Sequence, residues 1–228
     1  MPGIVISFDF NGNHQKSTIG SVDPADHFRM LDAAIERADP KRRHNIVVTA
    51  INWPLWTCDE NVRMIAWKLH ARCREVISYP YNQDHQVGAS WCLRMALEAA
   101  AAHGAEYLVH LADDVLLLTH TVDELVNLLG ADDYRGSGWD SQCTANTQVF
   151  VCRVARFVDF SRRLFLINPV EMAGCGQSLE GYLWHKMVAN DLKVVISEEW
   201  YPGRLYFHSH DAGAFFQKAK ELNSGRDV

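Results

Sequence analysis

The sequence predicts an α/β fold in which helices flank a central, mostly parallel sheet. Four short β-rich runs occur in the first half and begin 42, 29 and 32 residues apart, at 4–10, 46–51, 75–79 and 107–111. The intervals between them carry the apolar spacing of helices. The runs at 46–48 and 108–111 are apolar enough for strands covered on both faces. Alternation of strand and helix is typical of a parallel sheet.

Residues that begin and end helices support this order. Asp23-Pro24 provides a cap and a proline for the first helical position, and Asp39-Pro40 ends that helix. The second helix begins with a capping-box pattern at 57–60. The third runs from about 87 to 102, and Gly104 suits a left-handed cap. We therefore expect three helices between the four strands.

The pattern changes after Asp113-Asp114. A capping box at 121–124 begins a short helix, and a polar loop spans 132–146. The remaining expected elements are a strand at 148–154, helices at 156–166 and 180–190, and strands at 192–197 and 205–208. Residues 223–228 have no apolar side chain apart from Val228, so we expect them to fray.

Composition limits the class of protein. The 228 residues are 48% hydrophobic, which is enough for one domain with a sizeable core. Lys and Arg total 22 against 28 Asp and Glu, a net charge of −6, which disfavours nucleic-acid binding through a basic surface. The six cysteines form no C-x-x-C pair, and no signal peptide or apolar run of about 18 residues occurs. We expect reduced thiols and a soluble, cytoplasmic protein without a transmembrane segment.

Polar side chains follow each of the four expected strands. Asn11, Asn52 and Asn82 come after the first three, and Asp113-Asp114 comes after the fourth. Ligands of open α/β sheets bind beyond the carboxyl ends of the strands, so these residues could line one crevice. Two adjacent carboxylates after a buried strand repel each other unless a cation or hydrogen-bond donors compensate. The pair therefore indicates either a divalent metal site or a capped turn.

Two late histidines could complete such a site. His208 and His210 lie two residues apart, so in an extended segment both side chains project to the same side. Neutral imidazole is a common metal ligand. The alternative is that one or both histidines are structural.

The order of these features resembles the GT-A glycosyltransferases, which use nucleotide-diphosphate sugars. The resemblance covers nearly the whole chain and is carried by residues 4–11, 82–94 and 107–115. The last segment is similar to the family's D-x-D region, although Ala112 stands where a strict motif has its first aspartate. The resemblance implies a GT-A fold in a single domain, with a nucleotide-binding half at 1–115 and an acceptor and catalytic half at 116–228.

The resemblance also implies roles for individual residues. Asp114 would hold Mn²⁺ or Mg²⁺ on the donor diphosphate, with His208 or His210 as a further ligand. Glu180, at the end of a loop from 174 that resembles the acid-presenting loop of inverting members, would be the general base. An acidic residue in a first helical turn is also favoured by the helix dipole alone, so both interpretations of Glu180 stay open. The remaining residues expected to bind the donor are Phe8, Asn11, Asn52, Asn82, Arg94 and Asp113.

We therefore expect a metal-dependent, inverting glycosyltransferase, hexosyltransferase in type, whose partners are a nucleotide-diphosphate sugar and a glycan or other hydroxyl acceptor. One alternative is a sugar-1-phosphate nucleotidyltransferase, but such enzymes have a basic, glycine-rich loop after the first strand, and residues 11–16 hold one lysine and no arginine. Another alternative is a non-catalytic module that binds nucleotide sugars or glycans. Dinucleotide, P-loop, zinc-protease and α/β-hydrolase motifs are absent from the sequence.

Overall fold

The computed structural model describes residues 3–11, 24–51, 60–79, 85–137, 145, 147–164 and 179–224. Strands and helices alternate through the first half, as the sequence predicts. The elements are β1 (Ile4–Asn11), α1 (Pro24–Ala38), β2 (Asn45–Ile51), α2 (Glu60–Arg72), β3 (Glu75–Tyr79), α3 (His85–Ala102) and β4 (Tyr107–Ala112).

The second half adds shorter elements that extend the sheet and cover it. They are β5 (Val115–Leu117), α4 (Val122–Leu129), β6 (Tyr134–Gly136), β7 (Val149–Arg153), α5 (Val154–Leu164), α7 (Leu179–Ala189), β8 (Val194–Ile196), the 3₁₀ turn η2 (Glu198–Trp200), β9 (Tyr206–His208) and α8 (Ala212–Ser224). None of the helices within the described ranges combines the length and the apolar character needed to cross a membrane.

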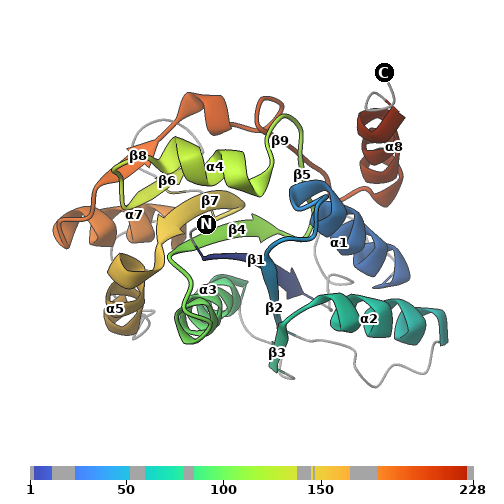
Figure 1. Cartoon of the computed structure of the whole chain (residues 1–228), viewed down its shortest axis with the longest axis horizontal. Helices are drawn as coiled ribbons and strands as arrows, with labels where there is room; N and C mark the ends of the chain where they lie inside the picture. The colour runs from blue at the N-terminus through green and yellow to red at the C-terminus, as the bar shows by residue number, and fades with distance from the viewer. Residues whose placement is uncertain are drawn as a thin grey trace.

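Seven strands form one central sheet in the order β3-β2-β1-β4-β7-β6-β8 (Figure 1). The pairs β3/β2, β2/β1, β1/β4 and β6/β8 are parallel, and β7 runs antiparallel to both of its neighbours. The predicted α/β class with a mostly parallel sheet is therefore confirmed. The carboxyl ends of β1, β2, β3 and β4 consequently meet at one edge, which is where the sequence places its polar strand ends.

A second, two-stranded sheet fixes the position of the late histidines. Strand β5 pairs antiparallel with β9, with Val115 opposite His208 and Leu117 opposite Tyr206. Since β5 begins directly after Asp113 and Asp114, this pairing brings β9 close to the end of β4 (Figure 1).

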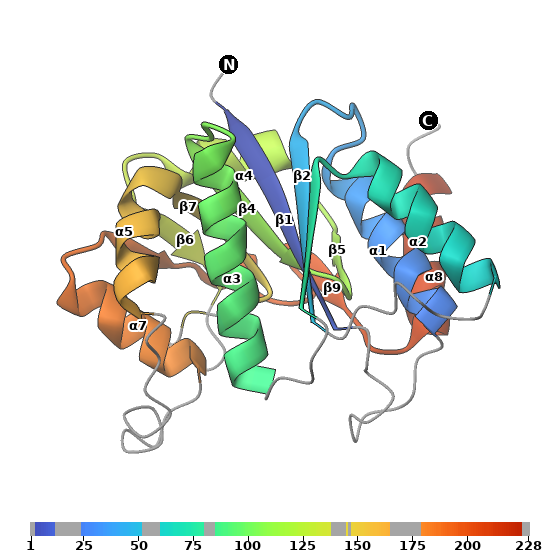
Figure 2. The ribbon, with the colours of Figure 1, turned by 90° about the horizontal axis from the view of Figure 1, so that it is seen from below.

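Apolar side chains form a core on each face of the central sheet. In β1, Ile6 and Phe8 point to the face covered by α1 and α4, and Val5 points to the face covered by α3, α5 and α7. Figure 2 shows α3, α5 and α7 gathered on one side of the sheet and α1 and α2 on the other. This alternation is the period of two expected of a strand buried on both faces.

Helix termini agree with their sequence signals. Gly104 follows α3 with φ +67°, and Ala105 N donates to Ala100 O at 2.9 Å, which is the hydrogen bond of a Schellman cap. At the start of α4, Glu124 Oε2 accepts from Thr121 N at 2.6 Å. Both predicted end signals are therefore confirmed. Asp39-Pro40 follows the end of α1 at Ala38, as predicted. Asp23 and residues 57–59, which belong to the two remaining start signals, lie outside the described residues.

Three elements differ from the sequence expectations. Strand β6 lies inside the segment expected to be a polar loop, and both β5 and α8 had no predicted counterpart. Strands of three residues are too short to show periodicity. Helix α8 reaches Ser224, so its last two residues are helical where fraying was expected; its start is set by Asp211, whose Oδ1 accepts from Ala214 N at 2.7 Å.

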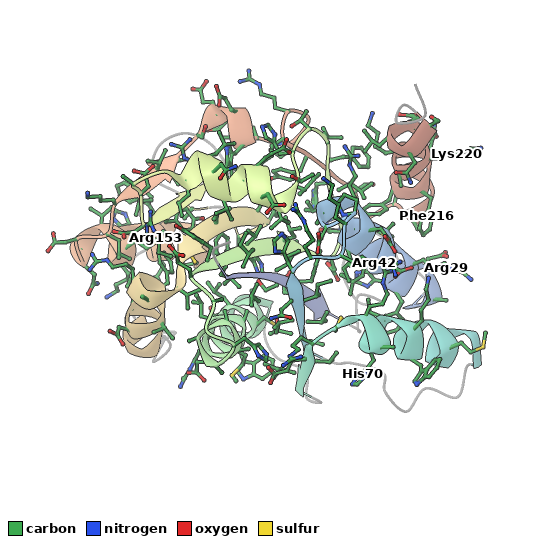
Figure 3. All side chains as sticks on the ribbon, in the orientation of Figure 1. Arg29, Arg42, His70, Arg153, Phe216 and Lys220 are labelled. Carbon is green, nitrogen blue, oxygen red and sulfur yellow. The ribbon has the colours of Figure 1, made fainter. Side chains whose placement is uncertain are left out.

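Charged side chains on the outer surface form local ion pairs. Arg29 binds Asp26 at 2.9 Å and Arg42 binds Glu36 at 2.8 Å, and both arginines are labelled near α1 in Figure 3. Arg72 of α2 contacts Asp32 as well as Glu36, which ties α2 to α1. Exposed pairs of this kind contribute about 0 to 1 kcal/mol each, so burial of the two cores dominates the stability of the fold.

One histidine is buried inside the sheet without a charge. His110 of β4 is 2% exposed, and its Nδ1 lies 2.9 Å from Ser7 Oγ of the neighbouring strand β1. Its ring stacks on Phe150 with centroids 4.9 Å apart. Burial lowers the pKa of His110 from its usual 6.5 to about 3, because the charged ring would lose its solvation. His110 is therefore neutral in the folded protein near pH 7.

We expect His110 to make the protein less stable as the pH falls below about 6.5. Between that pH and about 3 the unfolded chain protonates this histidine and the folded chain does not, so the free energy of unfolding should fall by up to about 1.4 kcal/mol per pH unit. Urea unfolding at pH 7.5, 6 and 5 measures this change in the free energy of unfolding. In His110→Gln, which does not titrate, the slope should be shallower. Parallel pH dependences of the two proteins would contradict this assignment.

Candidate functional site

Two acidic side chains lie almost buried at the carboxyl end of β4. Asp113 is 5% exposed and Asp114 is 6% exposed, and both belong to the turn between β4 and β5. Of the other polar strand ends, Asn52 and Asn82 lie outside the described residues. For Asn11 the structure describes the backbone, as the last residue of β1, but not the side chain. The site can therefore be built from Asp113 and Asp114 outward.

Two histidines converge on one oxygen of Asp114. Asp114 Oδ2 lies 3.1 Å from His208 Nε2 and 2.8 Å from His210 Nδ1. The pairing of β5 with β9 places His208, and Ser209 N donates to Asp114 O at 3.3 Å, which holds the next residues against the same turn. The two imidazole rings meet edge to face with centroids 4.7 Å apart. The structure thus brings both histidines to Asp114, and their role as metal ligands stays a prediction.

These three side chains fit a divalent cation. One potential ligand atom from each of Asp114, His208 and His210 lies within 4.8 Å of the other two. Carboxylate oxygens and imidazole nitrogens are ligands that first-row divalent metals accept. Within the described ranges, this is the group of His, Cys, Asp and Glu side chains that is close enough to share one ion.

Electrostatics keep Asp114 ionised. Burial alone would raise the pKa of Asp114, but hydrogen bonds and charge attraction from His208 and His210 hold it well below its usual value. In return, the hydrogen bond to Asp114 raises the pKa of His210 above 6.5, against the opposing effect of burial. The site therefore presents a negatively charged oxygen at neutral pH, which a cation requires.

Asp113 turns to a different partner. Its Oδ2 lies 2.5 Å from Nε2 of His27, a buried residue of α1. Burial alone would lower the pKa of His27, but the charge of Asp113 and the hydrogen bond between them raise it. His27 was not predicted as a site residue, although it shares the buried face of α1 with Leu31 and Ala38, where a polar residue is unexpected.

A third carboxylate approaches from β1. The side chain of Asp9 is 24% exposed and its Oδ1 lies 3.7 Å from His110 Nε2. Burial, followed by repulsion from Asp113 and Asp114, raises the pKa of Asp9 well above its usual value. The sequence interpretation named Phe8 and Asn11 from this segment and missed Asp9, which lies between them in β1.

The other predicted donor-binding residues lie elsewhere. Phe8 is fully buried in the core between the sheet and α1. Arg94 Nε on α3 donates to Glu98 Oε1 at 2.9 Å, one turn along the same helix. The structure does not bring either side chain to the Asp114 group, and their contact with a donor stays a prediction. Glu180 lies in the first turn of α7, as expected, but its side chain is outside the described part of the structure.

The contact between Asp114 and His210 makes a specific prediction for the metal-free protein. In Asp114→Asn the pKa of His210 should fall, because the hydrogen bond and charge that raise it are lost. Titration of the imidazole resonances by NMR in the presence of a chelator measures the pKa of His210. Asp132→Asn, which alters a carboxylate paired with Arg135, should leave the value unchanged. An unaltered His210 pKa in Asp114→Asn would show that the contact does not form in solution.

Solved structures share this architecture. A glycosyltransferase involved in the glycosylation of the major capsid of PBCV-1 matches with a TM-score of 0.59 and 11% identity, over 96% of this chain and 100% of that one. A protein provisionally named a nucleotide-diphospho-sugar transferase, from Desulfovibrio desulfuricans G20, matches with a TM-score of 0.56 and 13% identity, over 97% of each chain. No protein-family model and no curated protein matches the sequence. The chain therefore has the GT-A-like fold of nucleotide-diphospho-sugar transferases.

Proposed function

We propose that this protein is a metal-dependent glycosyltransferase that moves a sugar, hexosyl in type, from a nucleotide-diphosphate donor to a hydroxyl of a glycan or another acceptor. The observation that carries the proposal is the group formed by Asp114, His208 and His210 at the carboxyl end of β4. It lies at the edge of a parallel sheet where ligands of such sheets bind, in a fold that nucleotide-diphospho-sugar transferases also have.

Asp114 and the two histidines would hold Mn²⁺ or Mg²⁺. The bound ion would neutralise charge that develops on the leaving diphosphate. Mn²⁺ is the better fit, because Mg²⁺ prefers oxygen ligands and near-ideal octahedral geometry, whereas two of these three ligands are nitrogens. The pairing of β5 with β9 fixes His208 relative to Asp114, so the chain's own contribution is a ligand set already assembled before the ion arrives.

We further propose that transfer inverts the anomeric centre and that Glu180 removes the acceptor proton. An acceptor hydroxyl is a poor nucleophile, and a positioned carboxylate that takes its proton contributes about 10² to 10⁴ in rate. Support comes from the resemblance of residues 174–180 to an acid-presenting loop and from the position of Glu180 in the first turn of α7. The helix dipole would favour an acid at that position whether or not it is catalytic.

Two other functions remain alternatives with distinct outcomes. A sugar-1-phosphate nucleotidyltransferase would form a nucleotide sugar from a sugar phosphate and a nucleoside triphosphate and release pyrophosphate. A non-catalytic module would bind the nucleotide sugar without releasing nucleoside diphosphate. A panel of nucleotide sugars, and of nucleoside triphosphates paired with sugar-1-phosphates, each with Mn²⁺, separates the three: a transferase slowly hydrolyses its donor without an acceptor, a nucleotidyltransferase releases pyrophosphate, and a binding module releases neither product.

The metal site predicts the behaviour of Asp114→Asn. This change keeps the size of the side chain and removes its charge, so Mn²⁺ affinity should fall by at least about tenfold, and nucleoside diphosphates should bind no more tightly with Mn²⁺ than without it. Calorimetry with Mn²⁺, Mg²⁺, Zn²⁺ and Fe²⁺ measures the affinity and selectivity. Asp132→Asn should bind metal like the wild type. Metal-dependent nucleotide binding that survives in Asp114→Asn would overturn the assignment.

The proposed base predicts the behaviour of Glu180→Gln. Turnover should fall by about 10² to 10⁴, with nucleotide affinity nearly unchanged, because the base acts on the acceptor. A purely dipolar role predicts retained activity with a stability loss of about 1 kcal/mol or less. Turnover and melting temperature of Glu180→Gln, with Glu221→Gln on α8 as control, decide between them.

Near-native turnover in Glu180→Gln would assign the role of base to another acid, with Asp140 and Glu171 as the next candidates. NMR of the product anomer tests the stereochemistry separately, and retention of configuration would refute inversion whatever the variant does.

A further inference from the structure

We propose that His27 is a positioning residue that holds the Asp113 carboxylate away from the cation site, so that only Asp114 of the two adjacent acids binds metal. The inference rests on the proposed metal site at Asp114. It adds a residue from α1 whose role is to keep two neighbouring carboxylates from acting as one site.

The contact between His27 and Asp113 is close and enclosed. Nε2 of His27 lies 2.5 Å from Oδ2 of Asp113, and both side chains are less than a tenth exposed. His27 is held in place by its helix, because the next residue, Phe28, and Leu31 are fully buried in the core between α1 and the sheet. A partner fixed in this way restricts the orientation of the carboxylate that it binds.

The two acids leave the β4/β5 turn toward different elements. Asp113 meets α1, whereas Asp114 meets the strand β9 and the residues after it. His208 and His210 both contact Oδ2 of Asp114, and His27 contacts Oδ2 of Asp113. Each carboxylate therefore has its own imidazole partners, and the ligand set for a cation within the described ranges contains Asp114 without Asp113.

Removal of His27 would leave Asp113 buried beside Asp114 without the imidazole that now pairs with it. A buried, unpaired carboxylate is strongly disfavoured, and a nearby divalent cation is a compensating partner. Asp113 would then turn toward the cation or add its uncompensated charge to the site. Either change strengthens cation binding while it removes the fixed orientation of Asp113.

A double-mutant cycle with Mn²⁺ as the only ligand tests this inference. His27→Leu should tighten Mn²⁺ binding by about tenfold, measured by calorimetry and by the electron paramagnetic resonance of bound Mn²⁺. The double variant His27→Leu/Asp113→Asn should bind Mn²⁺ like the wild type, because the freed carboxylate is gone. His27→Gln, which keeps an N–H donor for Asp113, should also resemble the wild type.

Each variant can overturn the inference. Unchanged Mn²⁺ affinity in His27→Leu, or equal tightening in the double variant, would show that His27 does not act through Asp113. Equal tightening in His27→Gln would show that loss of charge alone explains the effect. If His27→Leu fails to fold, Asp113→Asn still decides: it should stay within about threefold of wild-type Mn²⁺ affinity, and a loss as large as that of Asp114→Asn would make Asp113 a ligand.

A control and a second measurement separate this inference from the proposed function. His103→Gln alters another histidine that contacts a carboxylate, Glu75, at 3.1 Å, and it should not affect Mn²⁺ binding. Absence of Mn²⁺ binding in the wild type would overturn both the metal site and this inference. Mn²⁺ binding that follows the cycle, without sugar transfer by any donor, would overturn the proposed function and support the role of His27.

Discussion

The crowding of three carboxylates at one end of an otherwise apolar sheet is the constraint that shapes this region. Asp9, Asp113 and Asp114 are close enough that the charges of the latter two raise the pKa of the first. Each acid meets the crowding differently: Asp9 has a raised pKa, Asp113 contacts His27, and Asp114 contacts His208 and His210. The buried charge is thereby divided among local partners, which is the condition under which buried carboxylates are tolerated.

These partners come from parts of the chain that the fold must first bring together. His27 lies on α1, and His208 belongs to a strand that pairs with β5 more than ninety positions earlier. The parallel order of β1 and β4 places Asp9 beside the turn that carries the other two acids. The site therefore depends on the topology of both sheets, because a change in register of β9 against β5 would reverse the side on which His208 projects.

Local sequence signals predicted those features that depend on neighbouring residues. Gly104 caps α3 because a left-handed conformation is cheapest for glycine, and the alternation of Ile4, Val5 and Ile6 follows from a strand buried on both faces. Spacing alone also suggested that His208 and His210 act together, since both project from one extended segment. The site partners of Asp113 and Asp9 depend on tertiary contacts instead, so their identities could not be obtained from the spacing of residues.

Two site residues that were not predicted, His27 and Asp9, leave a weak signal in the sequence. Only the tertiary structure shows what that signal means. His27 occupies the apolar face of α1, where a polar side chain indicates a buried partner but does not name it. Asp9 shares a face of β1 with Val5 and Ser7, so the residues on that face become more polar toward the carboxyl end of the strand. Both are polar exceptions in a buried pattern, and such exceptions are more informative about a site than the pattern itself.

This chain has low sequence identity to structures of the same fold because the core and the site constrain the sequence differently. At 11% and 13% identity the fold is shared although most side chains differ, because many combinations of apolar residues fill a core of given shape. The sheet determines where strand ends meet, and the side chains at those ends determine what can bind there. The proposed metal binding consequently depends on the side chains of Asp114, His208 and His210. The fold alone does not specify which residues stand at these positions. Their convergence on one carboxylate oxygen at the carboxyl edge of the sheet is the feature on which the proposed chemistry rests.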